Sequence, residues 1–119
     1  MANGNKVYEK TITNKIIRKL NLLPKCLVKK RLAGPMQKGQ PDITGCIDGI
    51  RIEIEVKVPG NTPTPKQEEW LKRWYSVGAI SFWADDADKA INKVTEIYNS
   101  ITQHREISSI IDKVLSRSG

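Results

Sequence analysis

The sequence predicts an α/β protein with a mixed central sheet flanked by helices. The expected order is helix, three strands, helix, strand and two final helices. Apolar residues recur at every third or fourth position near both ends of the chain, which is the period of an amphipathic helix. Between these ends, isoleucine and valine alternate with polar residues, which is the period of a strand. A length of 119 residues fits one domain, residues 1–119.

The first helix is expected over residues 6–23. Its apolar face carries Tyr8, Ile12, Ile16, Leu20 and Leu23, at steps of three and four. Pro24 ends this helix, because proline cannot donate the backbone hydrogen bond that a further turn requires. A short strand over residues 26–32 and a loop rich in glycine and proline follow.

The next two strands are expected to form a hairpin around Asp48-Gly49. This dipeptide favours a type I′ turn, in which both central residues adopt positive φ. The turn fixes the register, so that Ile47 faces Ile50, Gly45 faces Ile52, Ile43 faces Ile54 and Asp42 faces Glu55. One face of the hairpin then carries Ile43, Ile47, Ile50, Ile52, Ile54 and Val56. The opposite face carries Asp42, Thr44, Arg51, Glu53, Glu55 and Lys57.

The second half of the chain predicts a helix, a strand and two further helices. The first of these helices carries Trp70, Leu71 and Trp74 and ends at Gly78. Residues 79–84 predict an apolar strand in the interior of the sheet. Asp85 or Asp86 then caps a helix whose inward residues are Ile91, Val94, Ile97 (or Tyr98) and Ile101.

A last, separate helix is expected over residues 104–116, outside a core of about residues 6–98. Its apolar stripe comprises Ile107, Ile110, Ile111, Val114 and Leu115. The stripe predicts either packing of this extension on the core or contact with a second copy of the chain.

Composition excludes several classes of protein. His104 is the only histidine and the two cysteines have no metal-ligand spacing, so a zinc site is not expected. Cys26 and Cys46 are expected to be reduced, mostly buried thiols. No apolar run approaches the ~20 residues of a membrane span, and the N-terminus lacks the apolar core of a signal peptide. We therefore expect a cytoplasmic protein without a membrane partner.

The net charge of +7 favours a polyanionic partner such as DNA. The basic residues expected to contact DNA are Lys29, Lys30, Arg31, Lys38 and Lys66. Most of them lie just before the predicted hairpin, so the positive charge is concentrated beside its acidic residues.

The predicted register brings Asp42 and Glu55 together, with their Cβ atoms about 5 Å apart. Two like charges at this distance repel by roughly 3 kcal/mol at an effective dielectric constant near 20. Arg51 and Lys57 relieve part of this repulsion. A pair of carboxylates suits Mg²⁺ or Mn²⁺, which prefer oxygen ligands. The alternative is a solvated edge hairpin whose charges pair with one another, and a bulge would also separate the acids.

The motif Gly39-Gln40-Pro41-Asp42, followed by Glu55-Val56-Lys57, resembles the signature of the PD-(D/E)xK nucleases. The expected element order is similar to their restriction-endonuclease-like core, α-β-β-β-α-β. Together with Gln67-x-x-Trp70-Leu71 and Gly78, the motif resembles the VRR-NUC family, the virus-type replication-repair nucleases that phages often encode. The resemblance covers about residues 6–90.

The resemblance implies a role for each motif residue. Asp42 and Glu55 would bind the metal, with the backbone carbonyl of Val56. Lys57 would orient or activate the attacking water. Glu9 would approach the metal through water, and Gln67 would hold Lys57 or the substrate. The alternatives are an ordinary surface glutamate at position 9 and a plain first-turn helix residue at position 67. The motif does not require Glu53, which we expect to pair with a basic residue.

The resemblance also implies a function. It predicts a Mg²⁺-dependent (or Mn²⁺-dependent), structure-selective endonuclease that hydrolyses phosphodiester bonds in branched DNA such as Holliday junctions. Symmetric cutting of two strands favours a homodimer. The alternatives are a DNA-binding module without catalysis, and an exonuclease or restriction-type enzyme with the same core and another DNA substrate.

Overall fold

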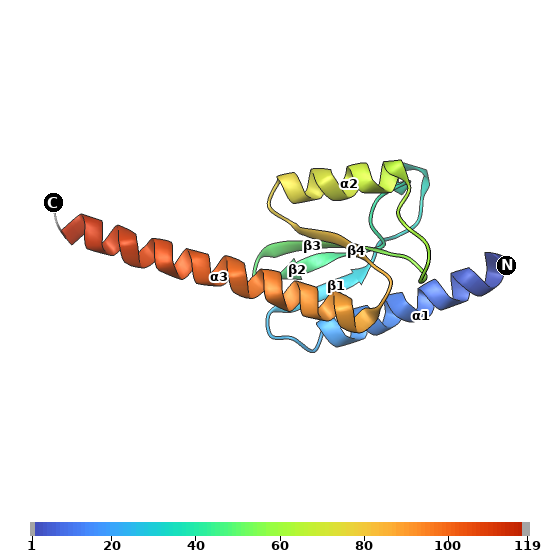
Figure 1. Ribbon diagram of the computed structural model, residues 1–119, viewed down its shortest axis with the longest axis horizontal. Helices are drawn as coiled ribbons and strands as arrows, with labels where there is room; N and C mark the ends of the chain where they lie inside the picture. Colours follow the sequence, from blue (N-terminus) through green and yellow to red (C-terminus); the bar gives the residue numbers. More distant parts are fainter. Residues whose placement is uncertain (1, 118–119) are drawn as a thin grey trace.

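The protein is described from a computed structural model that covers residues 2–117, with side chains from residue 6 onward. Its elements are α1 (Ala2–Leu20), β1 (Cys26–Lys30), the 3₁₀ turn η1 (Pro35–Gln37), β2 (Ile43–Ile47), β3 (Ile50–Val56), α2 (Pro65–Ser76), β4 (Ile80–Ala84) and α3 (Ala87–Arg117). The four strands form one mixed sheet in the order β1-β2-β3-β4. Helices α1 and α3 cover one face and α2 covers the other (Figure 1). The predicted α/β sheet flanked by helices is confirmed.

Helix α1 packs through the apolar face that the sequence predicts, although its ends differ. Ile12, Ile16 and Leu20 are buried, whereas Tyr8 is 54% exposed because it precedes the part of the helix that crosses the sheet. The helix begins at Ala2 and ends at Leu20, before Pro24. The early end follows from Asn21, whose side chain hydrogen bonds to both the N–H and the carbonyl of Val28 in β1.

The hairpin of β2 and β3 is confirmed, including its register. Asp48 and Gly49 adopt φ of 49° and 79°, as a type I′ turn requires. Ile47 pairs with Ile50, Gly45 with Ile52 and Ile43 with Ile54. The predicted apolar face is buried throughout. On the other face Thr44, Glu53 and Glu55 are buried, while Arg51 is exposed. Both strands lie inside the sheet, between β1 and β4, so the alternative of a solvated edge hairpin is wrong.

Strand β4 lies parallel to β3, with α2 as the crossover between them. It forms an edge of the sheet, so the prediction of an interior strand is wrong. Its apolar character comes from Ile80 and Phe82, which are buried under α3, while Trp83 is 37% exposed. Gly78 lies just after the end of α2 and adopts φ of 98°, so it terminates this helix as predicted.

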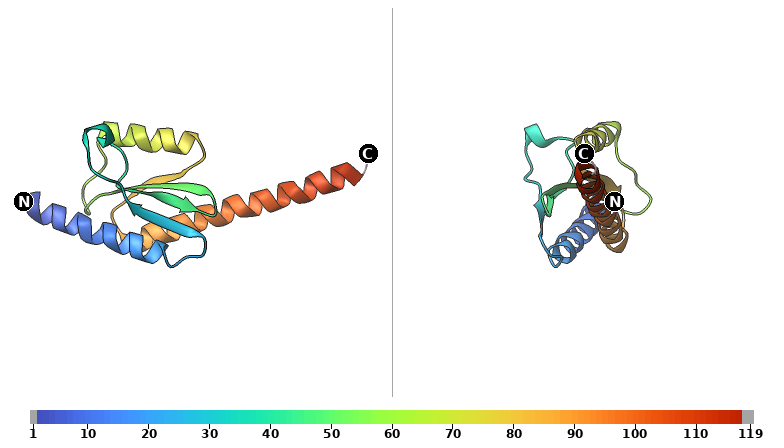
Figure 2. Two further views of the ribbon diagram at one scale, coloured as in Figure 1. Left: turned by 180° about the vertical axis from the view of Figure 1, so that it is seen from behind. Right: turned by 90° about the vertical axis from the view of Figure 1, so that its left-hand side faces the viewer.

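The two predicted C-terminal helices are one continuous helix of 31 residues, α3. Asp86 caps its N-terminus, where Oδ2 accepts a hydrogen bond from the N–H of Lys89. No glycine or proline interrupts the chain between residues 87 and 117, so nothing stops the helix at residue 103. The expected packing of residues 104–116 on the core is also wrong, because α3 continues beyond the sheet (Figure 2).

Two further expectations concern the cysteines and membranes. Neither Cys26 nor Cys46 is in a disulfide, and Cys46 is exposed because it points away from the apolar face of β2. The expectation of mostly buried thiols is therefore wrong for Cys46. Within residues 2–117, none of the helices combines the length and the apolar character that crossing a bilayer demands.

Candidate active site

Asp42 and Glu55 lie side by side, as the register predicts. Asp42 occupies a bend just before β2, and its Oδ2 accepts a hydrogen bond from the N–H of Val56 at 2.9 Å. Glu55 is 2% exposed on β3, and a side-chain hydrogen bond joins it to Asp42. Burial, this hydrogen bond and the charge of Asp42 raise the pKa of Glu55 to about 10. Glu55 therefore keeps its proton at neutral pH.

Lys57 and Glu9 complete this acidic site. The charge of Lys57 acts on both Glu55 and Glu9, lowering the pKa of each, although the pKa of Glu9 remains raised by burial and by Asp42. Glu9 is half-buried on α1 and close enough to Asp42 for their charges to interact, which favours the predicted site role over that of an ordinary surface glutamate. Lys57 directly follows β3, and its N–H donates to the carbonyl of Ala84 at 2.9 Å. Four predicted residues thus converge from three separate segments.

The site suits a hard divalent cation, although the protein supplies only part of a coordination shell. Among residues 2–117, no group of three or more His, Cys, Asp or Glu side chains is arranged to hold a metal. Asp42 and Glu55 offer two carboxylates without a neutralising arginine. Mg²⁺ usually keeps several waters and takes one or two protein carboxylates, which fits this donor set. The ligand role of the Val56 carbonyl stays a prediction.

Glu53 lies on the same face as Glu55 but in a different environment. It is completely buried, and its carboxylate accepts hydrogen bonds from Arg31 and Thr44 and from Arg51 Nε at 2.9 Å. The expectation that Glu53 pairs with a basic residue is confirmed. Its partner Arg31 was not predicted, because the two residues come from separate segments and no spacing in the sequence pairs them.

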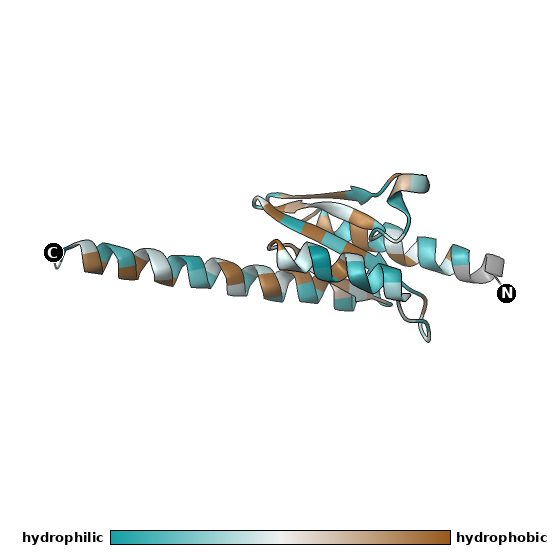
Figure 3. Cartoon of the chain, turned by 90° about the horizontal axis from the view of Figure 1, so that it is seen from above, coloured by the Kyte–Doolittle hydropathy of each residue, from teal (hydrophilic) through white to brown (hydrophobic). Residues whose placement is uncertain are grey.

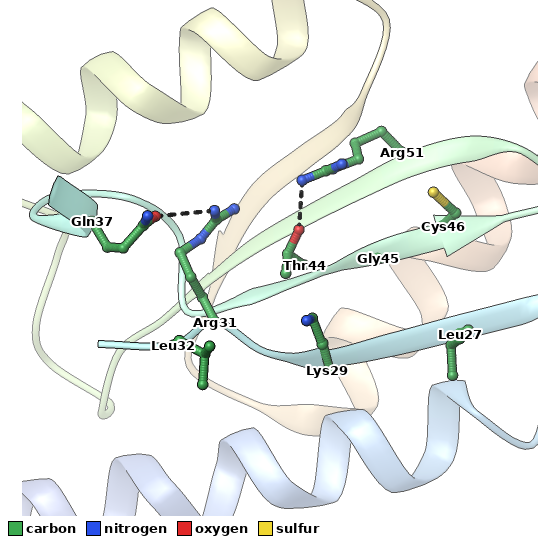
Figure 4. A pocket seen from close by; sticks show the side chains of 9 residues that line it. All are labelled: Leu27, Lys29, Arg31, Leu32, Gln37, Thr44, Gly45, Cys46 and Arg51. Carbon is green, nitrogen blue, oxygen red and sulfur yellow. Dashed lines mark hydrogen bonds between the residues drawn. The ribbon is translucent and has the colours of Figure 1, made fainter. Parts of the chain in front are cut away.

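Arg31 connects Glu53 to the segment that carries Asp42. Its Nε donates to the carbonyl of Pro41 at 2.9 Å, and its backbone N–H donates to the carbonyl of Asp42 at 2.7 Å. Arg31, Arg51 and Thr44 are among the residues that line an open pocket of about 530 Å³, where Arg51 donates a hydrogen bond to Thr44 Oγ1 (Figure 4). The ion pair with Glu53 therefore fixes the position of the Pro41-Asp42 backbone.

Helix α2 supports the same loop from the other side. Trp74 Nε1 donates to Gln40 Oε1 at 3.0 Å, and the guanidinium of Arg51 lies 4.5 Å from the centre of the Trp74 ring. Gly39 adopts φ of 83°, and a Cβ there would lie 2.8 Å from the Lys66 side chain. The position therefore requires glycine both for its backbone conformation and for the close approach of α2.

Gln67 has a structural role at the start of α2. Its side chain accepts a hydrogen bond from the N–H of Thr64 at 2.9 Å, and its N–H donates to Thr64 Oγ1 at 3.2 Å. These two bonds form a capping box. Within residues 6–117, no hydrogen bond joins Gln67 to Lys57. Gln67 therefore caps the N-terminus of α2, which is the alternative role expected of a first-turn helix residue. Its role toward the substrate stays a prediction.

The predicted DNA-contacting residues divide into two groups. The lysines are exposed: Lys29, Lys30, Lys38 and Lys66. Arg31 differs, because its side chain is 15% exposed and engaged with Glu53. The structure therefore leaves the four lysines available to a polyanion and uses Arg31 inside the protein.

The fold and the site define a mixed α/β protein, with a four-stranded sheet and a pair of acids, Asp42 and buried Glu55, beside a lysine. No family model matches this chain, and a search of curated proteins returns no match. The chemistry of the site itself is therefore the basis for a functional proposal.

Proposed function

We propose that this protein is a metal-dependent DNA endonuclease that hydrolyses phosphodiester bonds, with branched DNA such as a Holliday junction as its substrate. The observation that carries the proposal is the pairing of half-buried Asp42 with buried Glu55, with Lys57 as a nearby cation. Two adjacent carboxyl groups add no stability to a fold, and one lysine balances at most one of their two charges. A divalent cation and a phosphate group would supply what this arrangement lacks.

Each side chain has a chemical task in such a reaction. A divalent cation, when bound, polarises the phosphoryl oxygen and lowers the pKa of water. Glu55 would release its proton and hold the cation together with Asp42, and the Val56 N–H keeps the Asp42 carboxylate oriented. Lys57 would place a positive charge beside the negative charge that develops on the phosphate. Glu9 would hold a water molecule at the edge of the site.

The connectivity supports a relationship with the PD-(D/E)xK nucleases. The elements α1 to β4 run in the order α-β-β-β-α-β, and β4 pairs in parallel with the strand that carries Glu55. The motif residues of the VRR-NUC resemblance, Asp42, Glu55 and Lys57, lie around one site. These facts favour a restriction-endonuclease-like core and membership of that family as parts of the proposal.

The charge distribution supports DNA as the substrate. Lys29, Lys30 and Lys38 are exposed on β1 and on the loop that leads to Asp42, and Lys66 is exposed at the start of α2. Phosphate contacts by lysine contribute affinity without reading sequence, as a structure-selective enzyme requires. A DNA-binding module without catalysis is disfavoured, since DNA binding alone gives no reason to bury a carboxyl pair.

Cleavage of a panel of DNA substrates tests the proposal. Linear, flap, nicked and four-way DNA would be incubated with Mg²⁺, with Mn²⁺ and with EDTA. We expect internal cutting of the four-way substrate that EDTA and Asp42→Asn both abolish. Asp112→Asn, the same change at an exposed position of α3, should cut normally. Binding without cutting would support the DNA-binding module, and degradation only from DNA ends would support an exonuclease.

A further inference from the structure

The open pocket of about 530 Å³ lies over the part of the sheet that α2 leaves uncovered. Helix α2 packs on β3 and β4. Seen from the side of α2, the strand that leads into η1, which is β1, lies beside this helix and not beneath it (Figure 3). The pocket is lined by residues of β1, β2 and β3 and of the segment that follows β1. We refer to it as the basic pocket, because its charged residues are Lys29, Arg31 and Arg51.

The basic pocket carries more positive charge than the protein needs to compensate for Glu53. None of the described residues that line it is acidic. Arg31 and Arg51 both pair with Glu53, although one cation would balance this carboxylate. Lys29 is exposed and forms no ion pair within residues 6–117. Three positive charges against one negative charge leave an excess of two on a concave surface, and a bound anion would offset this excess.

Arg51 is held in a fixed position at this pocket. Its Nε donates to Glu53, its Nη2 donates to Thr44 Oγ1 at 2.9 Å, and its guanidinium lies 4.5 Å from the centre of the Trp74 ring. The side chain is nevertheless 43% exposed, and its Nη1 group makes no hydrogen bond to any residue that the structure describes. A guanidinium that is already fixed and still has free donors suits a phosphate, because little side-chain freedom is lost on binding.

The hairpin places the basic pocket in line with the acid pair. Thr44 and Arg51 point to the same side of the sheet as Glu55, and they lie two and four residues along the hairpin from the acid pair. At about 3.4 Å per residue, these steps span about 7–14 Å. Successive phosphates of one DNA strand advance by about 3.4 Å along the duplex axis, so the same span covers two to four nucleotides.

The uncharged residues of the pocket indicate a nucleic acid strand and not a free inorganic anion. Leu27 and Leu32 line the pocket and are 74% and 79% exposed, so they offer apolar contact beside the cations. A sugar–phosphate backbone presents both an apolar sugar and a charged phosphate. Such a backbone matches the lining better than a small, fully hydrated anion does.

We infer that the basic pocket binds a phosphate of the DNA strand that is cut, two to four nucleotides from the scissile bond, through Lys29 and Arg51. The inference rests on the proposed function for the identity of the DNA and the place of the cut. Binding of the phosphate by the pocket requires neither the metal nor catalysis, so it can be measured separately from cleavage.

Binding of four-way DNA in EDTA tests the inference. One phosphate at a time would be replaced by an uncharged methylphosphonate, and the affinity of the wild type would be compared with that of Lys29→Gln. We expect Lys29→Gln to weaken binding by about 3- to 10-fold and to lower the salt dependence by about one counterion. The methylphosphonate at the pocket should weaken binding of the wild type but add nothing to the loss in the variant. Lys113→Gln, the same change at an exposed position of α3, should bind like the wild type.

Cys46 provides a second readout, because its exposed thiol lines the same pocket. Peptide mass spectrometry of the wild-type chain would follow alkylation of both thiols by N-ethylmaleimide. Four-way DNA in EDTA should slow alkylation of Cys46 by at least about five-fold, since access to the thiol is lost, and leave Cys26 unchanged. Equal protection by a deoxynucleoside monophosphate at the same phosphate concentration would indicate a site for a free nucleotide and would overturn the inference.

Two further outcomes separate this inference from the proposed function. DNA binding in which Lys29→Gln and every methylphosphonate act additively, with Cys46 unprotected, would overturn the basic pocket and leave the nuclease proposal standing. Absence of DNA binding by the wild type would contradict both.

Discussion

Glu53 and Glu55 are two residues apart on β3, point to the same side of the sheet and are both buried, yet their surroundings differ. Glu53 is held by two arginines and a threonine. Glu55 faces another acid, Asp42, and has one lysine nearby. Burial of a carboxylate is costly unless a cation or hydrogen-bond donors compensate for it. The protein compensates fully for the burial of Glu53 and only in part for the burial of Glu55.

The difference separates a structural role from a functional one. The Glu53 network connects β2, β3 and the residue that follows β1, and it holds the backbone of Pro41 and Asp42 through Arg31. The Glu55 site has a proton where a cation could bind. The first network therefore positions the second site, and the same substitution at the two positions should have opposite consequences.

The largest expected effect is on cleavage after Glu55→Gln. The amide retains the shape of the side chain but provides one neutral oxygen in place of a carboxylate, so metal binding should fail. We expect cleavage of four-way DNA to fall by at least about 1,000-fold. Single-turnover kinetics at saturating Mg²⁺ would measure it. Cleavage at the wild-type rate would show that Glu55 is not a metal ligand.

Lys57→Ala should reduce the cleavage rate by about 100-fold or more, because the positive charge beside the phosphate is lost. DNA affinity should change little, since one phosphate contact among several contributes a small part of binding. Single-turnover rates and a binding titration in Ca²⁺ would separate the two quantities. A collapse of affinity with a normal rate for the bound complex would identify Lys57 as a binding residue.

Glu53→Gln should destabilise the protein by about 3 kcal/mol, since Arg31 and Arg51 would lose the carboxylate that pairs with them. Urea unfolding measures this change in free energy. Glu96→Gln, at an exposed position of α3, is the matched control and should be neutral. Unchanged stability of the Glu53 variant would mean that its ion pairs do not hold the site together.

Glu55→Gln should have the opposite effect on the metal-free protein and stabilise it, on the order of 2 kcal/mol at pH 8. Folding raises the pKa of Glu55 from 4.5 to about 10. The contribution of this group to stability is therefore complete below pH 4.5 and is lost as the pH rises toward about 10. Urea unfolding in EDTA between pH 5 and pH 9 should show an advantage of the variant that grows with pH. A pH-independent difference would refute the raised pKa of Glu55.

Gln67→Ala should have the smallest effect, a loss of about 0.5–1 kcal/mol, because it removes half of the capping box of α2. Thermal unfolding would detect the change, and cleavage should stay within about two-fold of wild type. A large loss of cleavage at normal stability would instead show that Gln67 acts on Lys57 or on the substrate.

The hairpin and the acid pair could be predicted from the sequence because their geometry is local. The turn at Asp48-Gly49 sets the register, and the register then places Asp42 beside Glu55. These residues are separated by one hairpin, so no knowledge of the remaining fold is needed.

The errors concern contacts between distant segments. The burial of Glu53 and Glu55 depends on the elements around the sheet, and the edge position of β4 depends on which strand it pairs with. The partnership of Arg31 and Glu53 joins the residue after β1 to β3, so spacing in the sequence gives no indication of it. The continuity of α3 was not predicted, although no glycine or proline lies between residues 87 and 117.

The central claim is that the buried acid pair is a metal site whereas Glu53 is structural, and Mn²⁺ binding in the absence of DNA tests it most directly. Calorimetric titration would compare the wild type, Glu55→Gln and the control Glu96→Gln at the same pH. The account predicts that the wild type and the control bind Mn²⁺ with equal affinity, and that Glu55→Gln loses at least about 100-fold in affinity. Equal binding by all three proteins, or no binding by the wild type, would contradict it.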